Sequence, residues 1–183
     1  MEHSKEIVLV LGGARSGKSS WALNHVEREY RSRLFLATAE VRDQEMAERV
    51  HLHQEARGPE WVLVEEPLEI PDVLTERCRG GDGVLIDCLT MWLSNIMLQE
   101  GETHVDSYKE RFFQALKITP AGVVMVSNEV GMGIVPEHPL GRAFRDAAGL
   151  LNQQAAAISD RVVLMVAGCP LWLKGGEGRE KNR

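Results

Sequence analysis

Short apolar runs alternate along the chain with longer segments in which apolar residues recur every three or four positions. The apolar runs predict β-strands over 6–11, 33–38, 61–65, 83–87, 121–127 and 161–167. The longer segments predict helices over 17–29, 42–57, 69–78, 89–98, 106–117 and 140–158. Several strand runs are largely Val, Ile and Leu, as expected for strands that helices cover on both faces. The pattern therefore predicts an α/β fold, with a mostly parallel sheet flanked by helices in three layers.

Glycine-rich segments mark turns between these elements but give no sign of a domain boundary. Residues 80–83 and 118–122 each separate a predicted helix from the next predicted strand. The sequence contains no internal repeat, linker or low-complexity tract, and 183 residues are enough for one domain. We expect a single domain over 1–174 and a flexible tail over 175–183, which is polar and rich in glycine.

Composition argues against several classes of protein. The net charge of −6, from 21 basic and 27 acidic residues, argues against a general nucleic-acid-binding surface. The apolar runs are too short for a transmembrane segment, and the charged first residues do not resemble a signal peptide. The cysteines Cys78, Cys88 and Cys169 form no close pair, which is typical of a protein in a reducing compartment. We therefore expect a cytoplasmic protein.

The first predicted strand runs directly into a glycine-rich loop with the spacing of a P-loop. The loop consists of Gly12, Gly13, Ala14, Arg15, Ser16, Gly17, Lys18 and Ser19. Its glycines allow successive backbone N–H groups to point at phosphate oxygens. Lys18 supplies a positive charge for the β- and γ-phosphates, and the Ser19 hydroxyl can bind Mg²⁺. The domain over 1–174 is therefore predicted to be a P-loop nucleotide-binding domain.

A second candidate for magnesium binding is Asp87, which ends the apolar run 83–87. This is the form of a Walker B element, although apolar strands also end in aspartate at ordinary turns. Beside a P-loop, the metal-binding interpretation is favoured. In the helix that follows, we expect Thr90 to cap the N-terminus and Trp92 and Leu93 to lie in the core.

The predicted helix 42–57 carries Arg49, His53 and Arg57 at intervals of four residues, so they share one face. Two guanidinium groups around an imidazole suit a phosphate-binding surface, with histidine as a nucleophile. By spacing alone, an exposed polar face is the more frequent explanation. The remaining histidines have no metal-like spacing and are expected on the surface: His3, His25, His51, His104 and His138.

The predicted strand 121–127 leads into Ser127, Asn128 and Glu129. Ligands of open α/β sheets bind at the carboxyl ends of strands, so this segment should face the P-loop. Its polar side chains could bind substrate hydroxyls or metal-bound water, or could equally cap a turn. The chain has neither a guanine-reading Asn-Lys-x-Asp motif nor an arginine-rich lid, which argues against a Ras-like switch and an adenylate-type kinase.

Together these motifs resemble the bifunctional adenosylcobinamide kinase/adenosylcobinamide-phosphate guanylyltransferases of cobalamin synthesis. The ordered series covers 12–19, 37–39, 45–53, Arg57, Trp61, Glu65, 87–95, 127–136, 141–146, 152–153 and 167–170. The resemblance extends over roughly residues 7–174. It implies a P-loop NTPase of the RecA-like type.

The resemblance also implies two reactions on one corrinoid. The hydroxyl of the aminopropanol arm is phosphorylated with ATP or GTP, and GMP is then transferred from GTP through a guanylyl-histidine. The family histidine falls on His53, with Lys18 and Arg57 as further catalytic residues. We infer that Arg49 adds charge stabilisation. The resemblance also implies that the protein is a homo-oligomer, with a trimer as the expected form.

The nucleotide contacts implied by the resemblance fall on seventeen positions, and magnesium on two of them, Ser19 and Asp87. The contacts are Gly12, Gly13, Ala14, Arg15, Ser16, Gly17, Lys18, Ser19, Ala37, Thr38, Ala39, Gln54, Glu55, Ala56, Arg57, Glu65 and Asp87. The family pattern often has a lysine after the histidine, where this chain has Gln54.

Two other functions compete with the bifunctional enzyme. One is a P-loop kinase with a single activity, in which helix 42–57 is only a substrate lid. The other is a nucleotide-dependent switch or scaffold without a small-molecule product. Uptake of α-labelled GTP and corrinoid-dependent turnover distinguish these alternatives.

Overall fold

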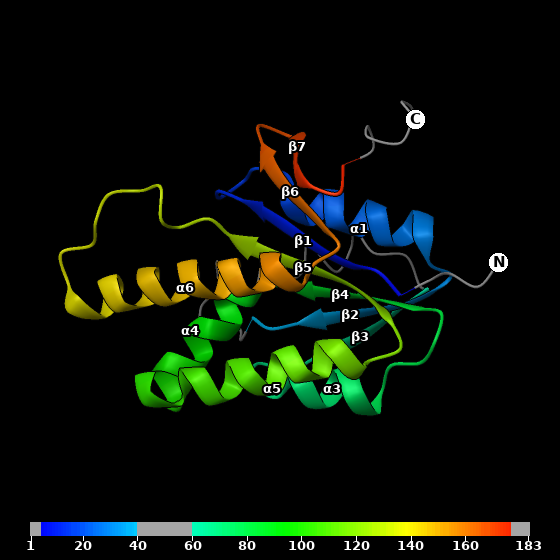
Figure 1. Cartoon of the computed structure of the whole chain (residues 1–183), viewed down its shortest axis with the longest axis horizontal. Helices are drawn as coiled ribbons and strands as arrows, with labels where there is room; N and C mark the ends of the chain where they lie inside the picture. The colour runs from blue at the N-terminus through cyan, green and yellow to red at the C-terminus, as the bar shows by residue number, and fades with distance from the viewer. Residues whose placement is uncertain (1–4, 40–59, 177–183) are drawn as a thin grey trace.

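The computed structural model describes residues 5–39 and 60–176, which form a seven-stranded sheet with helices on both faces (Figure 1). The strands are β1 (Ile7–Gly12), β2 (Ser32–Ala37), β3 (Trp61–Glu65), β4 (Asp82–Asp87), β5 (Gly122–Asn128), β6 (Arg161–Val166) and β7 (Cys169–Lys174). They lie in the order β3-β2-β4-β5-β1-β6-β7, and β7 pairs antiparallel while the others pair parallel. The P-loop strand β1 thus lies inside the sheet between β5 and β6, and β5 separates it from β4.

Helices cover the sheet unequally in the described part of the chain. They are α1 (Lys18–Glu29), α3 (Ile70–Glu76), α4 (Leu89–Gln99), η1 (Glu102–His104), α5 (Val105–Ile118) and α6 (Pro139–Ile158). Figure 1 shows α1 on one face, with α3 to α6 on the other. No helix among them is long and apolar enough to cross a membrane.

The alternation of side chains along β1 explains the three layers. Leu9 packs into the larger core with α3 to α6, while Val8 and Val10 pack into a smaller core with Ala22 of α1. All these side chains are buried, so β1 is apolar on both faces, as the continuous Val/Leu run predicts. The predicted three-layer α/β fold is confirmed.

Most predicted elements match the structure to within two residues at each end. The predicted helix 42–57 lies outside the described residues. The strand β7 was not predicted. It is an edge strand in which Leu171 and Leu173 are exposed, and Pro170 interrupts the apolar pattern.

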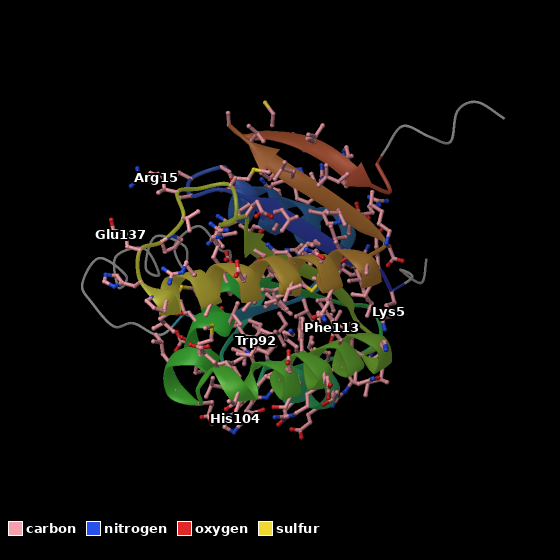
Figure 2. All side chains as sticks on the ribbon, turned by 60° about the vertical axis from the view of Figure 1, so that its left-hand side comes forward. Lys5, Arg15, Trp92, His104, Phe113 and Glu137 are labelled. Atoms are coloured by element: carbon pink, nitrogen blue, oxygen red, sulfur yellow. The ribbon has the colours of Figure 1, made fainter. Side chains whose placement is uncertain are left out.

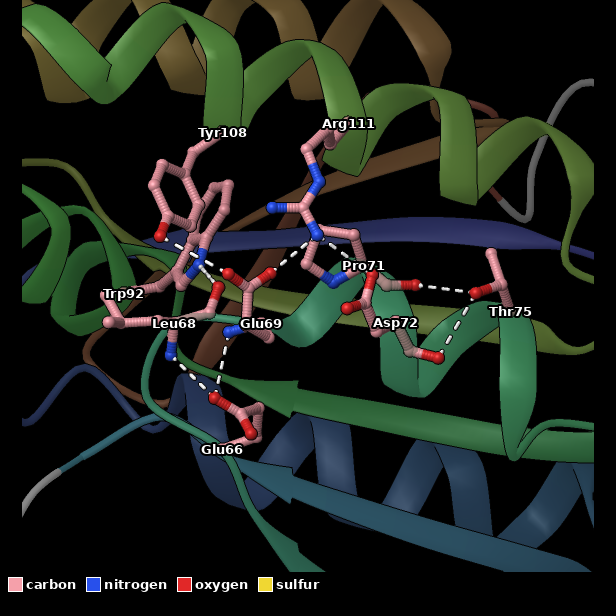
Figure 3. Close-up of polar contacts among 9 residues, drawn as sticks. All are labelled: Glu66, Leu68, Glu69, Pro71, Asp72, Thr75, Trp92, Tyr108 and Arg111. Carbon is pink, nitrogen blue, oxygen red and sulfur yellow. Dashed lines mark hydrogen bonds and ion pairs between the residues drawn. The ribbon is translucent and has the colours of Figure 1, made fainter.

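The β3–α3 connection is held by a cluster of polar contacts (Figure 3). Glu66 accepts hydrogen bonds from the backbone N–H groups of Leu68 and Glu69. Trp92 of α4 donates through Nε1 to the Leu68 carbonyl at 2.7 Å. Arg111 of α5 lies 2.6 Å from a Glu69 carboxylate oxygen, and its hydrogen bond to this carboxylate raises the guanidinium pKa, although burial acts in the opposite direction. These contacts fix the loop that follows the end of β3.

Candidate functional site

The carboxyl ends of the parallel strands meet at one edge of the sheet, and the candidate residues gather there. β1 ends at Gly12 beside Asn128 of β5, and β4 ends at Asp87 beside Ala37 of β2. β3 ends at Glu65, which pairs in register with Ala37 and is exposed. Figure 2 shows Arg15 of the P-loop at the end of the molecule opposite Lys5, which precedes β1.

The P-loop connects β1 to α1 in a conformation that requires glycine at two positions. Gly17 has φ 91°, in the left-handed region, and a Cβ there would lie 3.3 Å from Gly168 Cα. A Cβ on Gly12 would approach Ser16 Oγ closely and lie 2.8 Å from the Met165 carbonyl oxygen. The Gly168 N–H donates to the Ser16 carbonyl at 3.0 Å, so the β6–β7 turn supports the loop.

Lys18 and Ser19 form the first turn of α1, and Lys18 Nζ donates to the Gly13 carbonyl at 3.2 Å. This contact keeps the ammonium group over the loop. No acidic residue lies in the first turn of α1, so the positive end of the helix dipole is available to an anion.

A polar pocket of about 580 Å³ opens over this loop and is lined by 14–20 and Asn128. Two buried oxygen atoms at the pocket, Ser16 Oγ and Asn128 Oδ1, have no hydrogen-bond partner among the described residues. Buried polar atoms are normally paired, so these two atoms keep a hydrogen-bonding capacity that no described residue satisfies. The pocket has the size and polarity for a triphosphate.

The end of β4 is fixed by Thr38. The Thr38 hydroxyl donates to the Cys88 carbonyl and accepts from the Cys88 N–H, both at 2.7 Å, and the Thr38 N–H donates to the Asp87 carbonyl. Thr38 is fully buried. The resemblance implies a nucleotide contact here, but the structure shows the hydroxyl bound to the segment that carries Asp87.

Asn95 completes this arrangement, and sequence reasoning did not single it out. Its amide nitrogen donates to the carbonyls of Thr38 at 2.7 Å and Pro67 at 3.1 Å, which joins the loops after β2 and β3. Asn95 is buried on an otherwise apolar helix. A lone amide among apolar neighbours was the signal available in the sequence.

The end of β5 is held by residues from two helices. Ser127 Oγ donates to Asn152 Oδ1 of α6 at 2.7 Å, and the Asn128 N–H donates to Thr90 Oγ1 of α4 at 2.7 Å. Glu129 accepts from the Gly131 N–H at 3.1 Å. Ser127 and Glu129 therefore have structural partners, whereas Asn128 lines the P-loop pocket and its buried side-chain oxygen has no hydrogen-bond partner among the described residues.

Two expectations from the sequence are wrong. Thr90 does not cap α4; the N-cap is Cys88, whose sulfur accepts from the Met91 N–H. His25 is buried rather than on the surface, because it stacks on Trp21 with ring centroids 5.0 Å apart. Trp92 and Leu93 lie fully in the core, as predicted.

Ser19 and Asp87 could hold a divalent cation. Hydroxyl and carboxylate oxygens are the hard ligands that Mg²⁺ prefers, and it usually keeps phosphate oxygens and waters as well. Within 5–39 and 60–176, no three His, Cys, Asp or Glu side chains cluster as a metal site of their own. The donor set therefore suits a cation that arrives with the nucleotide.

The other predicted site residues lie outside the described part of the chain. They are Arg49, His53, Gln54, Glu55, Ala56 and Arg57. Their roles stay predictions.

Solved structures similar to this chain share its fold at low sequence identity. The RadB recombinase matches with a TM-score of 0.52 and 14% identity, covering 89% of this chain and 75% of its own. An ATPase from the type III secretion system of pathogenic bacteria matches with a TM-score of 0.54 and 14% identity, covering 88% and 52%. The fold is thus that of RecA-like P-loop ATPases, as predicted.

Sequence comparison gives a more specific result. A family model described as cobinamide kinase / cobinamide phosphate guanyltransferase matches residues 8–173. The bifunctional adenosylcobalamin biosynthesis protein CobP of Pseudomonas aeruginosa is 39% identical over 167 residues, which cover 91% of this chain and 96% of that protein. Its counterpart CobU of Salmonella typhimurium is 36% identical, with 92% and 99% covered. The predicted resemblance is confirmed, and the chain belongs to the cobinamide kinase / cobinamide phosphate guanyltransferase family.

Proposed function

We propose that one triphosphate-binding loop, 12–19, serves both reactions of this enzyme, the phosphorylation of cobinamide and the guanylylation of cobinamide phosphate in adenosylcobalamin biosynthesis. The observation that carries this proposal is the P-loop pocket, in which Lys18 and Ser19 lie with the unpartnered Asn128 Oδ1. A pocket that holds a triphosphate by its β- and γ-phosphates leaves the γ- and α-phosphorus atoms open to different nucleophiles.

In the kinase step, the hydroxyl oxygen of the aminopropanol arm bonds to the γ-phosphorus of ATP or GTP. The bond from that phosphorus to the β–γ bridging oxygen breaks, the nucleoside diphosphate leaves, and the hydroxyl proton passes to solvent. Lys18 stabilises the charge on the phosphates, and the loop N–H groups orient them. Ser19 and Asp87 would hold Mg²⁺, which supplies charge neutralisation when bound.

In the guanylyl transfer, a neutral ring nitrogen of His53 bonds to the α-phosphorus of GTP and pyrophosphate leaves. A phosphate oxygen of cobinamide phosphate then bonds to the guanylyl phosphorus, and the P–N bond to His53 breaks. The product is adenosylcobinamide-GDP and the histidine is regenerated. Arg57 and Arg49 are proposed to stabilise charge on the transferred group.

Further contacts support nucleotide recognition in this proposal. Glu65 is exposed at the end of β3, where a carboxylate can reach a ribose or base. On the family resemblance, we also propose nucleotide contacts from Ala37 and Ala39 and from 54–57, which follow the histidine. The free cysteines and the nucleotide substrates fit a cytoplasmic enzyme, and we propose a homo-oligomer, with a trimer as the family resemblance implies.

Labelling with α-³²P-GTP tests the covalent step. We expect the wild-type protein to take up acid-labile, alkali-stable label, the behaviour of a phosphoramidate. His53→Ala should take up none and should still phosphorylate cobinamide. The matched control is His51→Ala, two residues away, which should retain the label.

The same experiment distinguishes the alternatives. A wild-type protein that phosphorylates cobinamide without taking up label would refute the histidine intermediate. Equal labelling of His53→Ala and wild type would assign the nucleophile to another residue. Hydrolysis of GTP that does not respond to cobinamide would instead support a nucleotide-dependent switch.

A further inference from the structure

An apolar pocket of about 470 Å³ lies between α4 and α6, outside the P-loop pocket. Its lining includes Ser94, Met97, Leu98, Pro136, Leu140 and Phe144. Leu98 and Leu140 are 56% and 47% exposed, although they are large apolar side chains on opposite walls. Clustered exposed apolar residues of this kind mark a binding surface. We call this feature the α4–α6 pocket.

Helix α4 links the α4–α6 pocket directly to the nucleotide site. Thr90, in its first turn, accepts a hydrogen bond from the Asn128 N–H, and Asn128 lines the P-loop pocket. Ser94 follows four residues later on the same face, about 6 Å along the helix. The lining of the α4–α6 pocket therefore begins, at Ser94, one helical turn from the wall of the nucleotide site.

Helix α6 gives the same connection from the other side. Asn152 donates through its amide to the Asn128 carbonyl at 3.1 Å. Phe144 precedes Asn152 by eight residues, which places it about 12 Å along the axis and about 80° around the helix. Two helices thus join both sites through one residue, Asn128.

The segment between β5 and α6 forms a continuous rim from one site to the other. It starts at Asn128 in the P-loop pocket and reaches Pro136 in the α4–α6 pocket. Along it, Met132 is 82% and Ile134 97% exposed. Figure 2 shows Glu137, at its far end, on the same end of the molecule as Arg15 of the P-loop.

We propose that the α4–α6 pocket binds the corrin ring of cobinamide and so directs the aminopropanol arm into the P-loop pocket. This rests on the proposed function, since it assigns a place to the substrate of that reaction. A corrin ring carries methyl groups and apolar edges, which fit Met97, Leu98 and Leu140. Its peripheral amides require a few polar groups, which Ser94 and His138 provide at the same pocket. The pocket volume suits one edge of the ring, and the exposed rim residues cover more of it.

Substitutions of the two exposed leucines test this assignment without disturbing the core. Leu98→Asp and Leu140→Asp place a carboxylate against an apolar ligand from two different helices. The matched control is Leu150→Asp, on α6 and 54% exposed but outside the pocket. We measure cobinamide binding by equilibrium dialysis without nucleotide, the KM for cobinamide and for ATP in the kinase reaction, and the molecular mass by light scattering.

We expect Leu98→Asp and Leu140→Asp to weaken cobinamide binding and raise its KM roughly tenfold to a hundredfold, the loss of one buried leucine contact. The KM for ATP and the molecular mass should stay unchanged, and Leu150→Asp should match wild type. Unchanged cobinamide binding in both variants would overturn the proposal. A loss of oligomer mass would also overturn it, because the pocket would then be covered by a second copy of the chain. Wild-type phosphorylation of cobinamide tests the proposed function separately, whatever the variants do.

Discussion

Thr38 links the sequence motif after β2 to the position of the proposed magnesium ligand. Its hydroxyl both donates to and accepts from the backbone of Cys88, next to Asp87. A hydroxyl can do both at once, and a methyl group can do neither. We therefore expect Thr38 to act as a positioning residue, whose effect on the reaction passes through Asp87.

Replacement of Thr38 by valine, a residue of nearly equal size, should leave two buried backbone groups of Cys88 unpaired. We expect a loss of about 2–4 kcal/mol in the free energy of unfolding. We also expect a lower kcat at limiting Mg²⁺ that partly recovers at higher Mg²⁺. Thr38→Ser restores the hydroxyl and should regain most of both. A Thr38→Ser variant as impaired as Thr38→Val would refute this role and favour one for the methyl group. Urea unfolding and kinase rates against Mg²⁺ measure these effects.

The three cysteines differ in exposure, and this difference predicts their reactivity. Burial, with a smaller contribution from the neighbouring Asp82 and Asp87 carboxylates, raises the pKa of the Cys78 and Cys88 thiols to about 11. The thiolate is the reactive form, so at pH 8 only about one in a thousand of these groups is charged. Cys169 is exposed. Ellman's reagent at pH 8 should therefore titrate one thiol quickly in the folded protein and all three in urea. Cys169→Ser should remove the fast thiol, and a fast thiol that persists in this variant would contradict the assignment.

At the scale of elements, a strand could be predicted from the sequence only when its own residues carry the pattern that marks it. The strands β1, β4 and β5 are recognisable because both of their faces are buried, so each reads as a continuous apolar run. The edge strand β7 was missed because most of its residues are exposed and its pairing depends on β6. Strand propensity says little about whether an exposed segment forms a strand when that depends on pairing with a neighbouring strand.

The candidate site was likewise predictable only where its residues are close together in the sequence. The P-loop is one contiguous segment whose glycines and lysine have fixed spacing, so it was found directly. The network around Asn128 joins Thr90 of α4 to Asn152 of α6 across more than sixty positions of sequence. No local pattern contains such a contact, and only the folded sheet brings these residues together. The α4–α6 pocket could not be predicted for the same reason, because its lining residues come from segments that are far apart in the sequence.

At the scale of the whole molecule, nucleotide binding should stabilise the fold, because the P-loop joins β1, α1 and the β6–β7 turn. A ligand at one hundred times its Kd adds about 2.7 kcal/mol to the free energy of unfolding. For a chain of this size, that corresponds to a rise in Tm of about 5–10 °C. Calorimetric melting with GTP and Mg²⁺ measures it.

Two changes should remove this stabilisation for separate reasons. EDTA withdraws the cation that Ser19 and Asp87 would hold and should reduce the rise in Tm, while Lys18→Ala removes the charge facing the phosphates and should abolish it. Lys117→Ala is the matched control, because this lysine is exposed on α5, outside the P-loop pocket. It should melt with the same GTP-dependent rise as wild type. If Lys18→Ala kept the full rise, the triphosphate would have to bind elsewhere, and the orphaned oxygens of Ser16 and Asn128 would need another ligand. The melting curves thus test the nucleotide site independently of any turnover.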